Sequence, residues 1–299
     1  MEKSQNNTRF FWLLVLLFIS VGVSRPMEDL DSPELIVLTE LADAVFGYPD
    51  YKITGALVEA YNETWPQNPE ELGTYFEGDI LVPLSYKSAR FNGTRNGMRI
   101  TSYRWKGGVV PYKINGNFTP EQLKIINHAF EQYHTRTCVR FRPRTTENDY
   151  ISIINSGSGC WSCLGRIGGC QKVNLQSECL LNNGTTIHEL MHVLGFDHEH
   201  NRHDRDSYIL VVNDNIEPKK EHNFAKADSK KHSSFGVEYD YSSVMHYSLY
   251  AFSRNNEPTM VPLRDTSKVD KIGSRDDLSK GDVIKINKMY ECNMINNKK

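Results

Sequence analysis

Residues 188 to 198 read HELMHVLGFDH, and this run carries more chemistry than the rest of the chain together. His188 and His192 are four residues apart, so on a helix both imidazoles lie on one face and can reach the same metal ion. Gly195 has no β-carbon and can adopt the positive φ that turns the chain out of a helix. That turn is expected to return His198 as a third ligand. Three histidines leave one side of a tetrahedral zinc ion open, which is typical of a catalytic site.

Glu189 follows the first of these histidines directly. The open position on such a zinc ion holds a water, and the metal lowers the pKa of that water to roughly 7. Glu189 is therefore the candidate general base that takes the proton of this water. An isolated H-x-x-x-H pair is also compatible with a simple polar helix face. Five positions specified at fixed spacing within one short run favour the zinc site instead.

A second motif, SVMHY at residues 243 to 247, follows about fifty residues later. Together with HELMHVLGFDHEHNRHDRD, residues 188 to 206, it resembles the astacin family of zinc endopeptidases, a branch of the metzincins. The resemblance implies that Met245 forms a turn beneath the metal. It also implies that Tyr247 is a further zinc ligand in the resting enzyme and moves to stabilise the oxyanion during catalysis. The other matching positions are Phe196, Glu199, Arg202, Asp204, Arg205 and Asp206.

The amino-terminal segment predicts secretion. Lys3 and Arg9 precede an apolar run over residues 10 to 23, which ends in small residues. This pattern predicts a signal peptide over residues 1–24. The run is shorter than the roughly 20 residues that span a bilayer, so no membrane anchor is expected. Glycosylation sequons suit a secreted glycoprotein and occur at Asn62, Asn92, Asn117 and Asn183.

The chain has six cysteines, all outside the signal segment, which fits an oxidising compartment. Counting alone leaves fifteen pairings open. The resemblance to astacins implies two of the pairs, Cys138 with Cys292 and Cys160 with Cys179. Cys163 and Cys170 remain, in a glycine-bearing stretch, and are expected to close a small extra loop. A metal site or a redox pair is a less favoured reading of these two residues.

An acidic segment separates the signal peptide from the zinc motif. Residues 25 to 95 carry 13 acidic and 5 basic side chains, whereas residues 96 to 299 carry 23 acidic and 28 basic ones. Opposite net charges suggest that the segment folds onto the following domain, although solubility alone also accounts for them. Within it, FEGDI at residues 76 to 80 is similar to the F-x-G-D motif of astacin propeptides. The resemblance implies that the Asp79 carboxylate occupies the water position on zinc and keeps the enzyme latent.

The maturation site is expected between Arg95 and Asn96. The sequence RWKGGVVPY, residues 104 to 112, resembles the opening strand of the mature astacin domain, and counting back from its tryptophan gives Asn96 as the new amino terminus. Arg95 is a residue after which trypsin-like proteases cut, in a Gly- and Asn-bearing stretch that suits cleavage. The resemblance further implies that the new amino terminus contacts Glu199. The predicted organisation is a signal peptide over 1–24, a propeptide over 25–95 and a catalytic domain over 96–299.

The periodicity predicts an α+β fold. Apolar residues at helical spacing predict a helix over 120–135, with Thr119 as N-cap and a proline in the first position. A zinc helix is expected over 185–194, and a carboxy-terminal helix over 278–290 with Ser274 and Asp276 as capping candidates. Strands are expected over 109–114, 137–142 and 149–154. By resemblance this is the two-lobed zincin fold, with the active-site cleft between the lobes.

These observations predict a secreted, monomeric zinc endopeptidase that is made as a zymogen and hydrolyses protein substrates with one Zn²⁺ per catalytic domain. The alternative is a secreted, non-catalytic binding protein on a protease scaffold, for which loss of Glu189 or of a ligand would be the sign; neither is lost. A structural zinc domain is disfavoured because the site is open. The lysines at 219–220 and 230–231 have no aromatic platform, so nucleic-acid binding is not expected. With seven residues after Cys292, no appended CUB or EGF-like domain is expected.

Overall fold

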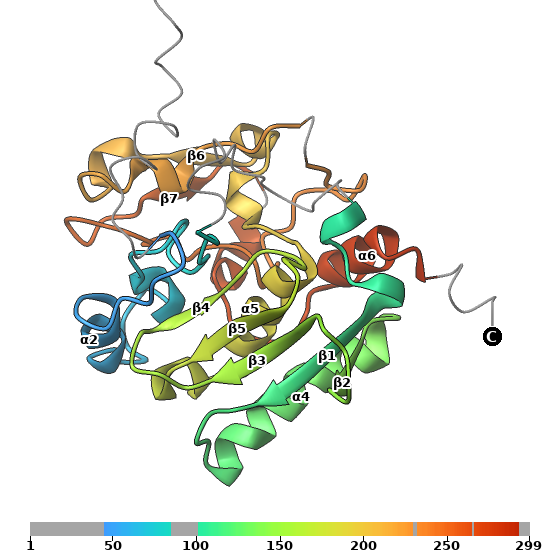
Figure 1. Ribbon diagram of the computed structural model, residues 1–299. Helices are drawn as coiled ribbons and strands as arrows, with labels where there is room; N and C mark the ends of the chain where they lie inside the picture. The colour runs from blue at the N-terminus through green and yellow to red at the C-terminus, as the bar shows by residue number, and fades with distance from the viewer. Residues whose placement is uncertain (1–44, 85–100, 230–231, 265, 293–299) are drawn as a thin grey trace, which may run out of the picture.

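The computed structural model describes residues 45–84, 101–229, 232–264 and 266–292. The expected signal peptide, Arg95 and Asn96 lie outside the described residues. Within the described part of the chain, no helix is both long and apolar enough to cross a membrane. The described residues form two lobes with the acidic segment between them, and this arrangement positions the zinc motif (Figure 1).

The first lobe contains a five-stranded sheet with the order β2-β1-β3-β5-β4. Four strands run parallel, and β4 pairs antiparallel with β5 at one edge. The three central residues of β3, the middle strand of the sheet, are buried, as expected for a strand whose sheet packs against helices. The strands are β1 (Val109–Ile114), β2 (Arg140–Pro143), β3 (Tyr150–Ile154), β4 (Cys160–Ser162) and β5 (Cys170–Leu175). The predicted strands over 109–114 and 149–154 are thus confirmed to within a residue.

Two helices pack against this sheet, α4 (Pro120–Arg136) and α5 (Gly184–Leu194) (Figure 1). The predicted cap of α4 is confirmed, because the Thr119 side chain accepts a hydrogen bond from the Gln122 amide and Pro120 opens the helix. The strand predicted from residue 137 begins only at Arg140. Thr137 instead ends α4, its amide bonded to the Tyr133 carbonyl.

The second lobe follows Gly195 and is built mainly from short 3₁₀ turns around a smaller core. Its two strands, β6 (Ile209–Val211) and β7 (Met260–Pro262), pair antiparallel. Its one α-helix among the described residues is α6 (Lys280–Met289). The turns are η5 (Glu199–Asn201), η6 (Arg205–Ser207), η7 (Asn213–Asn215), η8 (Glu221–Phe224) and η9 (Thr266–Lys271).

The capping candidates of the carboxy-terminal helix are wrong. Ser279, not Ser274 or Asp276, is the N-cap of α6, because its hydroxyl accepts from the Asp282 amide at 2.9 Å. The Asp282 carboxylate in turn accepts from the Ser279 amide at 3.1 Å. This reciprocal pair satisfies two amides that a helix start otherwise leaves without partners, so it determines where the helix begins.

The acidic segment lies between the lobes and carries α2 (Thr54–Glu59) and the turn η1 (Pro69–Leu72). On one side the Leu81 amide donates to the Ser162 carbonyl of edge strand β4 at 2.9 Å. On the other side the Ser248 hydroxyl donates to the Glu71 carboxylate at 2.6 Å. The segment therefore contacts both lobes. In Figure 1 it is the blue and cyan part of the chain beside β4.

Two disulfides have the pairing that the resemblance implies. Cys138 joins Cys292 across 154 residues, and Cys160 joins Cys179 across the loop before α5. The expected third link is absent, because Cys163 and Cys170 are free thiols. Cys163 is buried in a small apolar cluster, whereas Cys170 is exposed at the start of β5. The two side chains occupy different environments, so the extra loop is not closed.

Candidate active site

The zinc motif adopts the predicted geometry. Helix α5 carries His188 and His192 one turn apart and ends at Gly195, whose φ of 102° lies in the left-handed region that favours glycine. The Gly195 amide bonds the His192 carbonyl at 2.8 Å, and the Phe196 amide bonds the Met191 carbonyl at 3.2 Å. The chain therefore reverses tightly and brings His198 back beside the helix.

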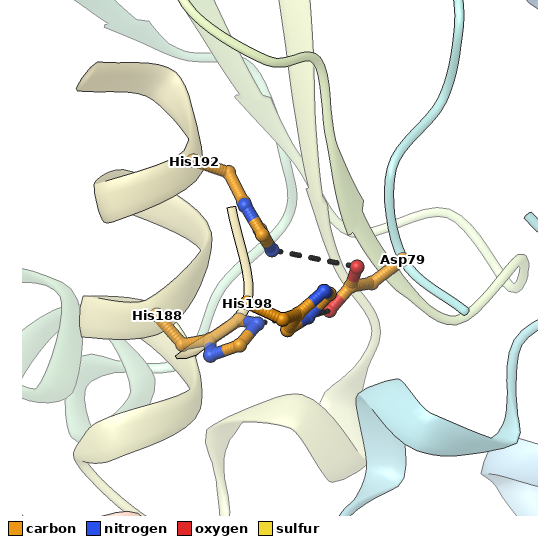
Figure 2. A group of neighbouring side chains, drawn as sticks. All are labelled: Asp79, His188, His192 and His198. Carbon is orange, nitrogen blue, oxygen red and sulfur yellow. Dashed lines mark hydrogen bonds and ion pairs between the residues drawn. The ribbon is translucent and has the colours of Figure 1, made fainter. Parts of the chain in front are cut away.

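Three imidazoles and one carboxylate converge on a single point (Figure 2). The ligand atoms of His188, His192, His198 and Asp79 all lie within 4.8 Å of one another, and all four side chains are buried. Asp79 Oδ2 is 2.9 Å from His188 Nε2 and 3.2 Å from His198 Nε2. Asp79 Oδ1 is 3.4 Å from His192 Nε2. Figure 2 shows Asp79 approaching from a separate segment, opposite the helix.

Nδ1, the second nitrogen of each imidazole, lies within hydrogen-bond distance of an oxygen. Nδ1 of His188 is 2.8 Å from the Val244 carbonyl, and Nδ1 of His192 is 2.7 Å from the Phe196 carbonyl. Nδ1 of His198 is 2.8 Å from the Glu77 carboxylate. An Nδ1–H donated to each oxygen leaves the lone pair on Nε2, which is the tautomer that a metal ligand needs.

These residues fit a zinc ion. Nε2 of His192 and Oδ1 of Asp79 are fully buried and have no hydrogen-bond partner, yet they face each other across 3.4 Å. Buried polar atoms without partners are rare, and a cation between these two atoms would satisfy both. Three imidazole nitrogens and one carboxylate oxygen are the donor set of four-coordinate zinc.

A tight turn places Asp79 at this point. Glu77 and Gly78 both have positive φ, 49° and 87°. A β-carbon at Gly78 would lie 3.1 Å from the Phe252 ring and 3.2 Å from the Glu70 carbonyl, so the position requires glycine for space as well as for conformation. The Gly78 amide closes the turn on the Tyr75 carbonyl at 3.0 Å. The glycine of the F-x-G-D motif thus has a defined physical role.

The two acids beside the imidazoles have opposite pKa shifts. Burial alone would raise the pKa of Asp79, but His198 and His192 outweigh it and hold the pKa well below its usual value. Burial and the nearby Asp79 carboxylate raise the pKa of Glu189 well above its usual value. The carboxylate oxygens of Glu189 accept no hydrogen bond, since the Ser162 hydroxyl donates to the Glu189 backbone carbonyl instead. Glu189 is fully buried in this structure.

Tyr247 and Met245 lie beside this group. The ring of Tyr247 packs 4.5 Å from that of His198, and its hydroxyl donates to the Glu77 carbonyl at 2.5 Å. The hydroxyl thus contacts the acidic segment in this structure, and its expected role as a zinc ligand stays a prediction. Met245 is buried, and its carbonyl accepts the Glu199 amide at 2.9 Å. This bond ties the methionine turn to the residue after the third ligand.

Sequence reasoning missed a second buried contact between the acidic segment and the catalytic lobes. Arg275 Nε is hydrogen-bonded to the Glu70 carboxylate, and its Nη2 is 3.8 Å from Glu71. The amide and hydroxyl of Ser248 both donate to Glu71 at 2.6 Å. The only signal in the sequence was an adjacent pair of acids in a segment already rich in acids. Nothing in that pattern points to an arginine more than 200 residues away.

Glu199 also has partners that the sequence did not indicate. Its carboxylate is fully buried and lies 2.6 Å from Lys285 Nζ and 2.9 Å from Arg202 Nη1. Burial opposes ionisation, but Lys285 and Arg202 outweigh it and lower the pKa of Glu199 to about 2. The expected contact with the new amino terminus involves residues outside the described ranges. The carboxylate is nevertheless already paired within the chain.

Three buried imidazoles directed at one point, with a glutamate next to the first on the same helix, define a zinc site of the catalytic H-E-x-x-H type. Residues 97–291 match the family model for Astacin, which describes a family of peptidases, and the chain belongs to this family. The matched domain is that of a zinc metalloendopeptidase.

Individual relatives agree with this assignment. Zinc metalloproteinase nas-7 of Caenorhabditis elegans is 34% identical over 283 residues, which cover 94% of this chain and 70% of the relative. Zinc metalloproteinase nas-8 of Steinernema carpocapsae is 42% identical over 220 residues, 73% of this chain but 52% of the relative. The chain thus spans about half the length of that relative. Among solved structures, High choriolytic enzyme 1, a hatching enzyme zinc-protease from Oryzias latipes, matches with a TM-score of 0.60 and 36% identity, over 66% of this chain and all of that one.

Proposed function

We propose that the protein is a secreted endopeptidase made as a latent precursor, with residues 25–95 as propeptide and residues 96–299 as catalytic domain. The observation that carries latency is the Asp79 carboxylate within hydrogen-bond distance of two of the three zinc-ligand imidazoles. A carboxylate at this position takes the place of an attacking water. Release is proposed to follow cleavage between Arg95 and Asn96 by a trypsin-like protease, and the mature enzyme is proposed to act as a monomer.

The edge strand β4 supports a mode of substrate binding. The Ser162 amide donates to the Asp79 carbonyl at 3.0 Å, and the Ser162 carbonyl accepts from the Leu81 amide. Residues 79 to 81 therefore occupy the backbone groups through which β4 could bind an extended peptide as an added strand. Once the propeptide leaves, the same amide and carbonyl are available to a substrate backbone.

The catalytic step follows from the residues beside the metal position. His188, His192 and His198 would hold the zinc ion, which would supply the Lewis-acid chemistry that activates water and polarises the scissile carbonyl. Glu189 takes the proton of the attacking water and passes it to the leaving amine. The Tyr247 hydroxyl, no longer bonded to Glu77, donates a hydrogen bond to the developing oxyanion. The presence of Glu189 and of all three histidines gives the non-catalytic alternative no support.

Arg275 supports a preference for acidic substrates. Its guanidinium is buried and is paired in this structure with Glu70, a propeptide residue. When the propeptide leaves, this cation loses its charge partner, and a buried arginine binds carboxylates well. We therefore propose that mature enzyme favours an acidic side chain next to the cleaved bond. Arg275→Gln is expected to abolish that preference in a peptide-library profile while the cleavage of neutral peptides persists.

The function is tested with purified precursor. Limited trypsin treatment is expected to produce a form that begins at Asn96, as read by mass spectrometry, and to switch on hydrolysis of a fluorogenic peptide. A zinc chelator should abolish that hydrolysis, and added Zn²⁺ should restore it. A trimmed, zinc-loaded protein that cleaves neither the peptide library nor denatured casein would contradict the proposal and favour the non-catalytic scaffold.

A further inference from the structure

Helix α6 places two charged side chains on its buried face, Asp282 and Lys285, one turn apart. Asp282 accepts from the Ser243 hydroxyl at 2.6 Å and from the Val244 amide at 3.0 Å. The Val244 carbonyl is in turn hydrogen-bonded to Nδ1 of His188. Asp282 therefore ties α6 to the methionine turn and, through it, to the first zinc ligand.

Lys285 ties the same helix to the other side of the metal position. Its Nζ is 2.6 Å from Oε2 of Glu199, the residue directly after His198, and both side chains are 1% exposed. Nζ also lies 3.5 Å from Asp282 Oδ1. The second oxygen of Glu199 accepts from Arg202 Nη1 and from the Asp240 amide, each at 2.9 Å. One lysine thus completes a network that fixes the turn carrying the third ligand.

The buried carboxylate of Glu199 already has Arg202 on one oxygen, and for the other oxygen two sources of a cation are available. One is the amino terminus created by the proposed cleavage at Arg95, a contact that the resemblance to astacins implies. The other is Lys285, which is already in contact with Glu199 before any cleavage. A second ammonium at this carboxylate would lie close to Lys285, where the repulsion of like charges disfavours it. The two sources therefore compete for one place.

We propose that Lys285 is an internal positioning residue for the metal site, and that beside Arg202 it supplies the second cation on Glu199 whatever residue begins the mature chain. The turn from His198 to Arg202 and the methionine turn are then already set in the precursor. Maturation then exposes these two turns without rearranging them. The proposal rests on the proposed cleavage near Arg95 only in that it concerns the mature form.

The test compares mature proteins with different amino termini. A site-specific protease sequence inserted ahead of the domain yields forms that begin at Arg95, Asn96 or Gly97, in the wild type and in Lys285→Gln, Lys285→Arg and Lys288→Gln. Lys288 is the matched control, since it is exposed on the same helix and donates to the Phe235 carbonyl. For each protein we would measure kcat and KM on a fluorogenic peptide, the rate of zinc loss to a chelator, and the melting temperature.

The three wild-type forms are expected to agree within about threefold in kcat/KM and in zinc loss. Lys285→Gln should lower kcat by about tenfold or more with KM little changed, and it should speed zinc loss by about tenfold. In this variant, both kcat and the rate of zinc loss should depend on which residue begins the mature chain. Lys285→Arg should restore most of this loss, and Lys288→Gln should behave as wild type.

Two results would overturn the proposal. One is a spread of about tenfold or more among the wild-type forms, with the Asn96 form best, because the amino terminus would then be required. The other is a Lys285→Gln protein indistinguishable from Lys288→Gln. If Lys285→Gln does not fold, the wild-type series alone decides. Inactivity of every wild-type form would contradict the proposed function instead, and zinc loss and melting temperature would still report on Lys285.

Discussion

Replacing Asp79 in the uncut precursor separates the charge of this residue from the steric cover of the propeptide. Asp79→Asn keeps the size of the side chain but removes the negative charge of a carboxylate whose two oxygens lie 2.9 to 3.4 Å from three imidazoles. The processing site is blocked in the same protein by Arg95→Gln, so that activity cannot come from the mature enzyme. The matched control is Glu63→Gln, which removes an exposed propeptide charge and preserves the sequon at Asn62.

The magnitude follows from the contacts that remain. Removing one partner of a buried charged group costs about 3 to 5 kcal/mol, and each 1.4 kcal/mol is about tenfold in an equilibrium. The closed state should therefore lose about two to four decades of preference over the open one. Other anchors persist, namely Glu70 on Arg275, Glu71 on Ser248 and the strand contact at Ser162. Asp79→Asn precursor should gain about hundredfold in activity yet stay below the mature enzyme.

The assay is the initial rate of hydrolysis of a small fluorogenic peptide, with gel electrophoresis before and after to show that the precursor is intact. The Glu63→Gln precursor should remain as inactive as wild type. An intact Asp79→Asn precursor as silent as this control would refute the reasoning, because steric cover by the remaining anchors would then suffice for latency.

Further predictions concern the mature enzyme and the cysteines. Glu189→Gln should keep zinc bound, as metal analysis would show, but lower kcat by several orders of magnitude because the proton acceptor is lost; near-normal turnover would exclude the mechanism. Tyr247→Phe should cost about one to three decades in kcat, since one oxyanion donor is removed, and a loss as large as that of Glu189→Gln would assign it another role. Removing the 154-residue link with Cys138→Ala and Cys292→Ala should lower the free energy of unfolding by about 4 to 5 kcal/mol in urea titrations. Maleimide should label Cys170 in the native precursor and spare Cys163, which is buried and whose pKa burial raises to about 12; equal labelling of both would contradict the described packing.

The local features of the fold were predictable because their causes are local in sequence. The histidine spacing, the glycine at the end of α5 and the capping box of α4 act within a few residues. The cap of α6 is local in the same way, since the S-x-x-D capping box lies at residues 279 to 282, downstream of the predicted Ser274 and Asp276.

The missed contacts have causes that are remote in sequence. Glu70 and Arg275 are 205 residues apart, and Glu199 and Lys285 are 86 apart. A lysine on an amphipathic helix is ordinarily on the solvated side, and only the packing of α6 against the methionine turn determines that Lys285 is buried. The disulfide result has a related origin, because the sequence shows that Cys163 and Cys170 are close in the chain but not that one faces the core and the other faces solvent.

The bond between Glu77 and His198 has a consequence for how the protein acquires its metal. Glu77 belongs to the proposed propeptide, yet it holds Nδ1 of the third ligand, and Asp79 adds a fourth donor from the same turn. Partners of this kind change metal affinity by about 10- to 100-fold, so both contributions depart together when the propeptide is released. The precursor is then the form best able to capture zinc from a dilute supply. The mature enzyme would retain an ion loaded during biosynthesis, and chelators should strip zinc from it faster than from the uncut chain.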